Sequence, residues 1–225
     1  MTLTKDSIYE LINAPTQVMK QHFVEYFTGD GLDTFRWYRR DVAQSNTGAL
    51  SCNNCNGSNE GYRFVNGDTG SYSWQNLDFN NVRQFNPDGS VIIGVLASRF
   101  PDGYNGGGRG GISLCLSNST DTGETHSACL KNDSGEGANI LAMCKDSSST
   151  SSASTGIPRI LDGTFFVGKI ELGASSYKYG VNGVLKATIS TDLPSEKMQP
   201  KIMSISRATG EQIYNYIRYC EAWNT

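Results

Sequence analysis

Six cysteines give this sequence its clearest opportunity for metal or redox chemistry. Cys52 and Cys55 have the Cys-x-x-Cys spacing of zinc sites and redox pairs, but a four-thiolate zinc site needs a second such pair, which the sequence lacks. Three of the remaining cysteines fall on successive expected strands, where neighbouring sulfur atoms could meet. Reduced, buried thiols are the default, and a disulfide or a bound metal stays open for Cys52, Cys55, Cys115, Cys129, Cys144 and Cys220.

The two histidines, His22 and His126, do not complete a recognisable catalytic set. A nucleophilic serine of the hydrolase type would lie within Gly-x-Ser-x-Gly, and the sequence has no such motif. We therefore expect both histidines to be surface residues without a catalytic role.

Residues 102–111 form a Gly-rich loop that contains Tyr104 and Arg109. The loop lacks the Gly-Lys-Ser/Thr end of a phosphate-binding loop, and no helix is expected after it to supply a dipole. Its glycines allow a mobile loop or the close approach of a ligand. Aromatic and guanidinium groups stack on sugars or anchor interfaces, so we predict ligand binding by Tyr104, Arg109, Trp74, Trp37 and Tyr62. The alternative is that the aromatic rings are buried and structural.

Four aspartates lie in Gly-containing turns, where carboxylates and backbone carbonyls could hold a calcium ion. They are Asp30, Asp33, Asp102 and Asp162, the first three being the candidates for a site. Ordinary turn hydrogen bonding also explains aspartate at such positions. We therefore expect no cofactor, with calcium left open.

These residues belong to short strands rather than helices. One segment, 7–13, has the apolar spacing of a helix, and Pro15 ends it. From residue 22 onward, short β-rich runs alternate with turns, and Asn182-Gly183 is typical of a two-residue hairpin. The pattern predicts an all-β, antiparallel β-sandwich of the jelly-roll type over residues 22–225, preceded by a tether with a short helix over residues 1–21.

The composition excludes several classes of function. The chain has 225 residues, a formal net charge of −3 and a pI near 5.4, so it lacks the basic surface that nucleic-acid binding requires. Its apolar runs are far shorter than the roughly 20 residues of a membrane-spanning helix, so we expect no membrane insertion. The N-terminal residues lack the charged and apolar regions of a secretion signal.

Three short motifs resemble the concanavalin A-like lectin/glucanase superfamily, and within it the laminin-G-like jelly rolls. Residues 23–33, followed by Arg36-Trp37, resemble the opening strand. Residues 110–116 resemble a strand in mid-sheet, and residues 177–184 the hairpin before the final strands. The resemblance implies two antiparallel sheets packed face to face, with a concave face for ligands. Laminin-G-like domains often hold calcium.

Two enzyme signatures of this superfamily are incomplete here. Its glucanases carry Glu-x-Asp-x-x-Glu on one strand, and retaining hydrolysis needs two carboxyl groups about 5–5.5 Å apart. The nearest strand, 169–173, offers only Glu171. Residues 176–182 resemble an alginate-lyase motif, but its partner motifs are absent, so we interpret Tyr177 and Tyr179 as neighbours on one face of a hairpin. We therefore expect that the protein is not an enzyme.

The sequence favours a non-enzymatic jelly-roll module of an assembled surface, in particular a virion structural, decoration or fibre protein with adhesin-like carbohydrate binding. Its expected partners are other subunits of the assembly and glycans, and its expected location is a virion or extracellular surface. Two alternatives stay open: a polysaccharide-active enzyme (a glycoside hydrolase or a lyase) on the same fold, and a secreted cell-surface lectin. Analogy at the level of the fold does not decide between them.

Overall fold

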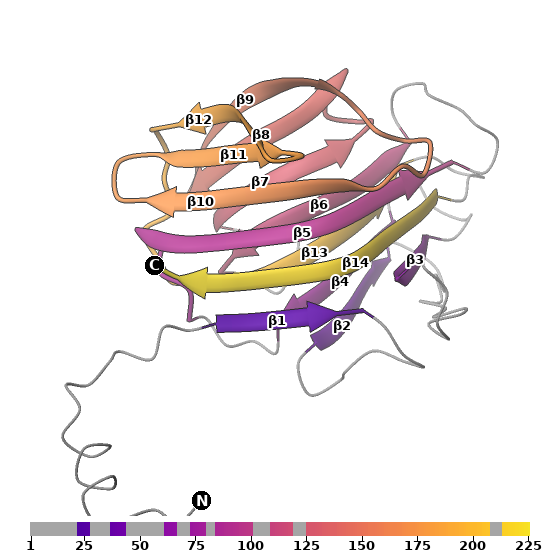
Figure 1. Cartoon of the computed structure of the whole chain (residues 1–225), viewed down its shortest axis with the longest axis horizontal. Coiled ribbons are helices and arrows are strands. Elements are labelled where there is room, and N and C mark those ends of the chain that lie inside the picture. The colour runs from indigo at the N-terminus through magenta and orange to yellow at the C-terminus, as the bar shows by residue number, and fades with distance from the viewer. Residues whose placement is uncertain are drawn as a thin grey trace, which may run out of the picture.

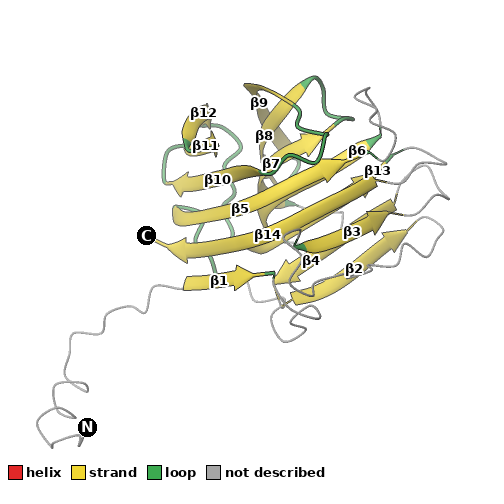
Figure 2. Ribbon diagram, turned by 45° about the vertical axis from the view of Figure 1, so that its right-hand side comes forward, coloured by secondary structure: helices red, strands yellow, loops and turns green. Residues whose placement is uncertain are grey.

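The computed structural model describes residues 22–27, 37–43, 61–66, 73–79, 84–100, 109–118, 125–207 and 213–225. These residues form strands and loops with no helix among them, so this part of the chain has no helix that could span a membrane (Figure 2). The tether and short helix expected within residues 1–21 lie outside the described residues.

The front sheet, nearest the viewer in Figure 1, has the strand order β1-β14-β5-β10-β11-β12, and β3 pairs with the other half of β14. All of these pairings are antiparallel. The strands are β1 (His22–Tyr26), β3 (Tyr62–Asn66), β5 (Gly89–Arg99), β10 (Phe166–Gly173), β11 (Tyr177–Val181), β12 (Val184–Ile189) and β14 (Ile213–Asn224).

The back sheet has the order β2-β4-β13-β6-β7-β8-β9 and is also antiparallel. Its strands are β2 (Trp37–Ala43), β4 (Ser73–Phe79), β6 (Gly110–Ser117), β7 (His126–Asp133), β8 (Asn139–Asp146), β9 (Ser149–Pro158) and β13 (Gln199–Ser206). The two sheets pack face to face, which confirms the expected all-β sandwich (Figure 1).

Burial differs between the two sheets. Side chains of β10 alternate between buried and more exposed positions, as expected for a strand with one face toward the core and one toward water. By contrast, β6 and β13 are buried at every position. The middle of the back sheet is therefore enclosed on both faces.

The two sheets interlock at a pair of glycines. Gly94 of β5 and Gly168 of β10 are direct partners in the front sheet, and Leu114 and Leu130 are partners in the back sheet. A Cβ at Gly94 would lie 2.9 Å from Cδ1 of Leu114. A Cβ at Gly168 would lie 2.9 Å from Cδ2 of Leu130. The leucines thus fill the space that the missing side chains leave, which gives the core its close packing.

An aromatic cluster extends the core where β1, β2, β3 and β4 meet. Trp37 is 1% exposed and packs against Phe23, Phe27 and Phe79. Tyr62 is 3% exposed, and its ring centroid lies 6.2 Å from that of Phe27. Neither ring has a face on which a sugar could stack. The ligand-binding role predicted for Trp37 and Tyr62 is corrected to a role in the core.

The lyase-like hairpin directs its two tyrosines into the core. Tyr177 and Tyr179 share one face of β11, as predicted, and are buried. The hydroxyl of Tyr179 lies 2.9 Å from Sγ of Cys144 and donates to the carbonyl of Met143. The hydroxyl of Tyr177 donates to the carbonyl of Pro194. Burial raises the pKa of both tyrosines, so they remain protonated at neutral pH and serve packing.

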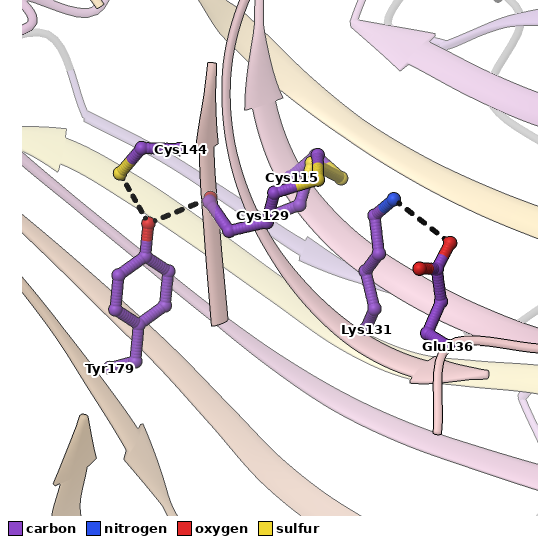
Figure 3. The surroundings of a disulfide bond; sticks show 7 residues. Cys115, Cys129, Lys131, Glu136, Cys144 and Tyr179 are labelled. Atoms are coloured by element: carbon purple, nitrogen blue, oxygen red, sulfur yellow. Dashed lines mark hydrogen bonds and ion pairs between the residues drawn. A yellow bond between two sulfur atoms is a disulfide. The ribbon is translucent and has the colours of Figure 1, made fainter. Parts of the chain in front are cut away.

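The cysteines do not all follow the reduced default. Cys115 on β6 and Cys129 on β7 are cross-strand partners with Cα atoms 4.2 Å apart, and they form a disulfide (Figure 3). Cys144 and Cys220 are free and buried, as the default predicts. Burial raises the pKa of Cys144 to about 11 and also raises that of Cys220. The Cys-x-x-Cys pair at 52–55 lies outside the described residues.

Replacing Gly168 with valine should lower the free energy of unfolding by about 1–3 kcal/mol, because added methyl groups must displace Leu130 in a packed core. Gly180→Val is the matched control: the nearest atom to a Cβ at Gly180 is 3.5 Å away, an ordinary contact. Urea denaturation of both variants measures the difference. Equal stability losses would contradict the interlock.

Cys144 and Cys220 should resist iodoacetamide in the folded protein at pH 8. The thiolate is the reactive species, and a raised pKa keeps both thiols protonated at that pH. Peptide mapping by mass spectrometry should find both residues alkylated only after unfolding in urea. Rapid modification of either residue in the native protein would show that the burial of these thiols is wrong.

Candidate functional site

The outer face of the back sheet, which points away from the core, carries buried polar side chains. Ser113, Ser127 and Gln199 are 1%, 0% and 0% exposed. The residues next to them in the chain belong to the core: Leu114, Ala128 and Met198. Strand alternation therefore directs these polar groups outward. The two serine hydroxyls and both amide atoms of Gln199 have no hydrogen-bond partner. Buried polar atoms are nearly always paired, so enclosed water molecules are the partners that suit these atoms.

The disulfide and a buried lysine lie in the middle of this outer face. Lys201 of β13 is paired in register with Cys115, which is paired in turn with Cys129. On its other side, Lys201 is paired with Asp78 of β4. Farther along the sheet, three partly exposed side chains of β8 also point outward: Leu141, Met143 and Lys145. The face thus changes from enclosed and polar at β13 to more accessible and mixed at β8.

At one end of the outer face, Arg207 joins two carboxylates. Its Nη2 donates to Oδ2 of Asp133 (2.8 Å) and to Oε1 of Glu136 (2.9 Å), so these two oxygens are at most about 5.7 Å apart. Nζ of Lys131 lies 3.4 Å from the same oxygen of Glu136, beside the disulfide (Figure 3). Asp133 is almost completely buried, whereas the side chain of Glu136 is 28% exposed. We name Asp133 and Glu136 the acidic pair.

The turn after β7 sets the geometry of the acidic pair. The carboxylate of Asp133 accepts a hydrogen bond from the backbone N–H of Gly135 (2.8 Å), and its carbonyl accepts one from the N–H of Glu136 (3.1 Å). A Cβ at position 135 would lie 2.3 Å from Nε of Arg207, so a larger residue there would displace the arginine side chain. The sequence Asp-Ser-Gly-Glu therefore places two carboxylates around one guanidinium.

Arg109, at the end of the Gly-rich loop, is tied to the same turn. Its backbone N–H donates to Oγ of Ser134 (2.8 Å), and its carbonyl accepts from the N–H of Arg207 (2.9 Å). Its guanidinium lies over the ring of Phe100, 5.8 Å from the centroid. The structure thus brings one predicted ligand-binding residue next to the acidic pair.

A hollow of about 470 Å³ lies beside this turn, lined by Ala138 and residues 157–162. Nη1 of Arg159, in its wall, donates to the carbonyl of Ser134 (2.6 Å). The side chain of Asn132 holds the backbone of Ile160 through two hydrogen bonds. The wall is therefore fixed to the segment that carries the acidic pair. The volume is in the range of about 300–1,000 Å³ that is common for ligand pockets.

The other predicted site residues lie elsewhere or outside the described residues. The backbone of Trp74 is in β4, paired with Ile205 of β13. Tyr104 and three of the turn aspartates are outside the described residues: Asp30, Asp33 and Asp102. The fourth, Asp162, accepts a hydrogen bond at Oδ1 from the backbone N–H of Thr164 (2.9 Å). Within the described part of the chain, no group of three or more His, Cys, Asp or Glu side chains could hold a metal ion. Calcium binding stays a prediction.

A second ionisable cluster closes the opposite end of β7. Nδ1 of His126 lies 2.6 Å from Oδ1 of Asp146, and its Nε2 lies 3.6 Å from Oε1 of Glu196. Asn118 donates to Glu196, and Ser195 donates to Asp146. These contacts fasten the segment before β13 to the ends of β6, β7 and β8. His126 is buried within them, so the expectation of a surface histidine is wrong for this residue.

The acidic pair is not among the predicted site residues, although the sequence contains a signal for it. Residues 131–136 read Lys-x-Asp-x-x-Glu, which matches the Asp-x-x-Glu end of the glucanase motif with lysine at the first carboxylate position. A search for carboxylates along one strand overlooks it, because Asp133 ends β7 and Glu136 lies in the following turn. Arg207 is 71 residues away from Glu136, so the link between them appears only in the folded chain.

No protein-family profile and no curated protein matches the sequence. Solved structures do match. An endo-acting O-glycanase of the human gut microbiota, described as initiating mucin breakdown, has a TM-score of 0.59 and 10% identity, with 90% of this chain and 98% of that chain covered. A putative beta-glucanase from Mycobacterium abscessus has a TM-score of 0.58 and 11% identity, with 89% of this chain and 99% of that chain covered. The metal-free form of the Emp46p carbohydrate recognition domain has a TM-score of 0.54 and 13% identity, with 85% of this chain and 89% of that chain covered.

The chain shares its fold with these proteins, a β-sandwich found in glycan-cleaving enzymes and in a carbohydrate recognition domain. At these identities the likeness establishes the fold alone. It contradicts the expectation that the protein is not an enzyme, because structures that share nearly the whole fold are described as glycan-cleaving enzymes. None of the three is described as a virion protein, so the virion interpretation gains no support from them. A surface location stays a prediction.

Gly135→Ala should lower the free energy of unfolding by about 2–3 kcal/mol, because displacing Arg207 leaves Asp133 buried without its cation. In an Arg207→Ala background the same substitution should cost little, since the obstructed side chain is gone. Urea denaturation of the wild type, the two single variants and the double variant completes a double-mutant cycle. Additive losses from the two substitutions would contradict the contact between Gly135 and Arg207.

Proposed function

We propose that this protein cleaves a glycan bound at the accessible end of the outer face of the back sheet, beside β7 and β8, with the acidic pair as its catalytic carboxylates. One observation carries the proposal: a single guanidinium nitrogen holds oxygens of Asp133 and Glu136 at most about 5.7 Å apart. Retaining glycoside hydrolysis uses two carboxyl groups about 5–5.5 Å apart, one as nucleophile and one as acid and base.

The surroundings of the two carboxylates suit different roles. Asp133 is fixed by the N–H of Gly135 and by two nitrogens of Arg207, so its orientation is set before a substrate binds. Glu136 is more exposed, and its contacts with Lys131 and Arg207 both fall on Oε1. We assign Glu136 as the group that protonates the leaving oxygen through Oε2, and Asp133 as the second carboxylate.

The rest of the outer face supports a glycan as the ligand. Its accessible part, at β8, offers Lys145 as a donor to the hydroxyl groups of sugars, whereas Ser113, Ser127 and Gln199 are enclosed. The likeness to a beta-glucanase, an O-glycanase and a carbohydrate recognition domain supports the same ligand class. The Emp46p domain is described in a metal-free form, which implies that it also has a metal-bound form. We therefore keep calcium binding at the aspartate turns as part of the proposal. We place the activity at an extracellular surface, where such polymers occur.

The test is release of new reducing ends from laminarin and from mucin O-glycans. Glu136→Gln should slow release at least 100-fold, the lower part of the usual range for loss of a general acid. Glu171→Gln is the matched control, because Glu171 pairs with Lys169 on β10 of the other sheet. It should keep the wild-type rate.

Two results would overturn the proposed function. One is the absence of new reducing ends when the wild-type protein is incubated with both substrates. The other is a Glu136→Gln variant that cleaves as fast as the wild type while circular dichroism shows that it is folded.

A further inference from the structure

The outer face of the front sheet carries an ordered group of aromatic side chains. Tyr26 is 63% exposed, and its ring centroid lies 5.1 Å from that of Tyr219. The rings of His22 and Trp223 meet edge to face, with centroids 6.4 Å apart. Glu221 lies between the two ring pairs on β14. We name these five residues the aromatic platform; they are on the opposite side of the sandwich from the outer face of the back sheet (Figure 1).

Strand pairing fixes the spacing of the aromatic platform. In the register of β1 with β14, His22 is opposite Trp223 and Tyr26 is opposite Tyr219. The residues between them on β14, Cys220 and Ala222, belong to the core, so Tyr219, Glu221 and Trp223 all point outward. Two residues four positions apart on a strand are separated by about 13 Å. The two ring pairs therefore span a length suited to an oligosaccharide rather than to a single sugar.

Glu221 is held in place at the centre of the platform. Nε2 of His22 lies 2.8 Å from its Oε1, and the hydroxyl of Tyr219 donates to its Oε2. Burial opposes ionisation of Glu221, but the hydrogen bonds from Tyr219 and His22 outweigh it and lower the pKa. Each carboxylate oxygen can accept a second hydrogen bond, so Glu221 can also bind a hydroxyl group.

We propose that the aromatic platform is a second glycan-binding site, which takes a neutral oligosaccharide with one sugar on the exposed ring of Tyr26, another beside Trp223, and a hydroxyl group on Glu221. The proposed function supplies only the class of ligand. The geometry supplies the rest: the rings of Tyr26 and Tyr219 are tilted by 56°, so they offer separate faces, and a positioned acceptor lies between the two ring pairs. Ionised Glu221 disfavours an acidic sugar at the same place.

The platform combines aromatic rings with a hydrogen-bonding group. Partly exposed aliphatic side chains adjoin it: Val24 is opposite Glu221 on β1, and Ile93 and Val95 of β5 are opposite Glu221 and Tyr219. Protein partners also bind exposed aromatic rings, but a sugar uses both a ring face and a positioned hydrogen-bonding group, which favours a glycan here. Because the platform and the acidic pair lie on opposite faces, the platform would hold one segment of a polymer away from the cleaved segment.

The test is titration of laminarihexaose and cellohexaose, followed by tryptophan fluorescence and calorimetry. All proteins carry Glu136→Gln, so that the probes stay intact. Trp223→Ala and Tyr26→Ala should each weaken binding at least 10-fold. Tyr26 is largely exposed, so its variant keeps the fold even if Trp223→Ala does not. Tyr214→Ala is the matched control, since Tyr214 is on the same strand but lies under Arg63 outside the platform.

Unchanged affinity in both platform variants would overturn the inference, and so would the absence of saturable binding of either hexasaccharide to the parent protein. Failure of the proposed function looks different: platform-dependent binding would persist, while wild-type protein would release no reducing ends. Conversely, hydrolysis by the wild type with platform-independent binding would overturn only this inference.

Discussion

The insertion of two leucines into a two-glycine gap determines how closely the sheets can approach. Gly94 and Gly168 are partners in the front sheet, and Leu114 and Leu130 are partners in the back sheet. The contact fixes both the distance between the layers and the position of β6 and β7 along the core. Since alternate residues of a strand point to opposite faces, fixing the inward leucines also fixes every outward side chain on these two strands.

The outer face of the back sheet depends on this constraint. Ser113 and Cys115 flank Leu114 on β6, and Cys129 directly precedes Leu130 on β7. The acidic pair begins three residues beyond Leu130. The backbones of β6 and β7 also lie close together at the end of the two strands. A Cβ at Gly111 would lie 1.9 Å from the carbonyl oxygen of Asn132. Asp133 is thus held by packing on the far side of β7 and by Arg207 on the near side, and Arg207 also holds Glu136 in the turn that follows.

The fold class could be predicted from the sequence because its signals are local. Asn182 and Gly183 both adopt positive φ, as a tight hairpin with this dipeptide requires. The site could not be predicted in the same way, because its links are long-range. Aromatic residues are common in cores and in binding sites alike, so Trp37 was assigned to a site although it packs inside. The acidic pair needs Arg207, which reaches it only after β13 has joined the sheet.

The disulfide has a consequence for the covalent integrity of the chain. Cys115 and Cys129 join adjacent strands across a separation of 14 residues that includes the whole connection between β6 and β7. A protease that cuts this connection leaves the two fragments linked through sulfur as well as through the hydrogen bonds of the two strands. The nicked protein would run as one species on a non-reducing gel and as two after reduction. The connection between these strands can therefore be cut, or rebuilt with a different sequence and length, without releasing either half of the sandwich.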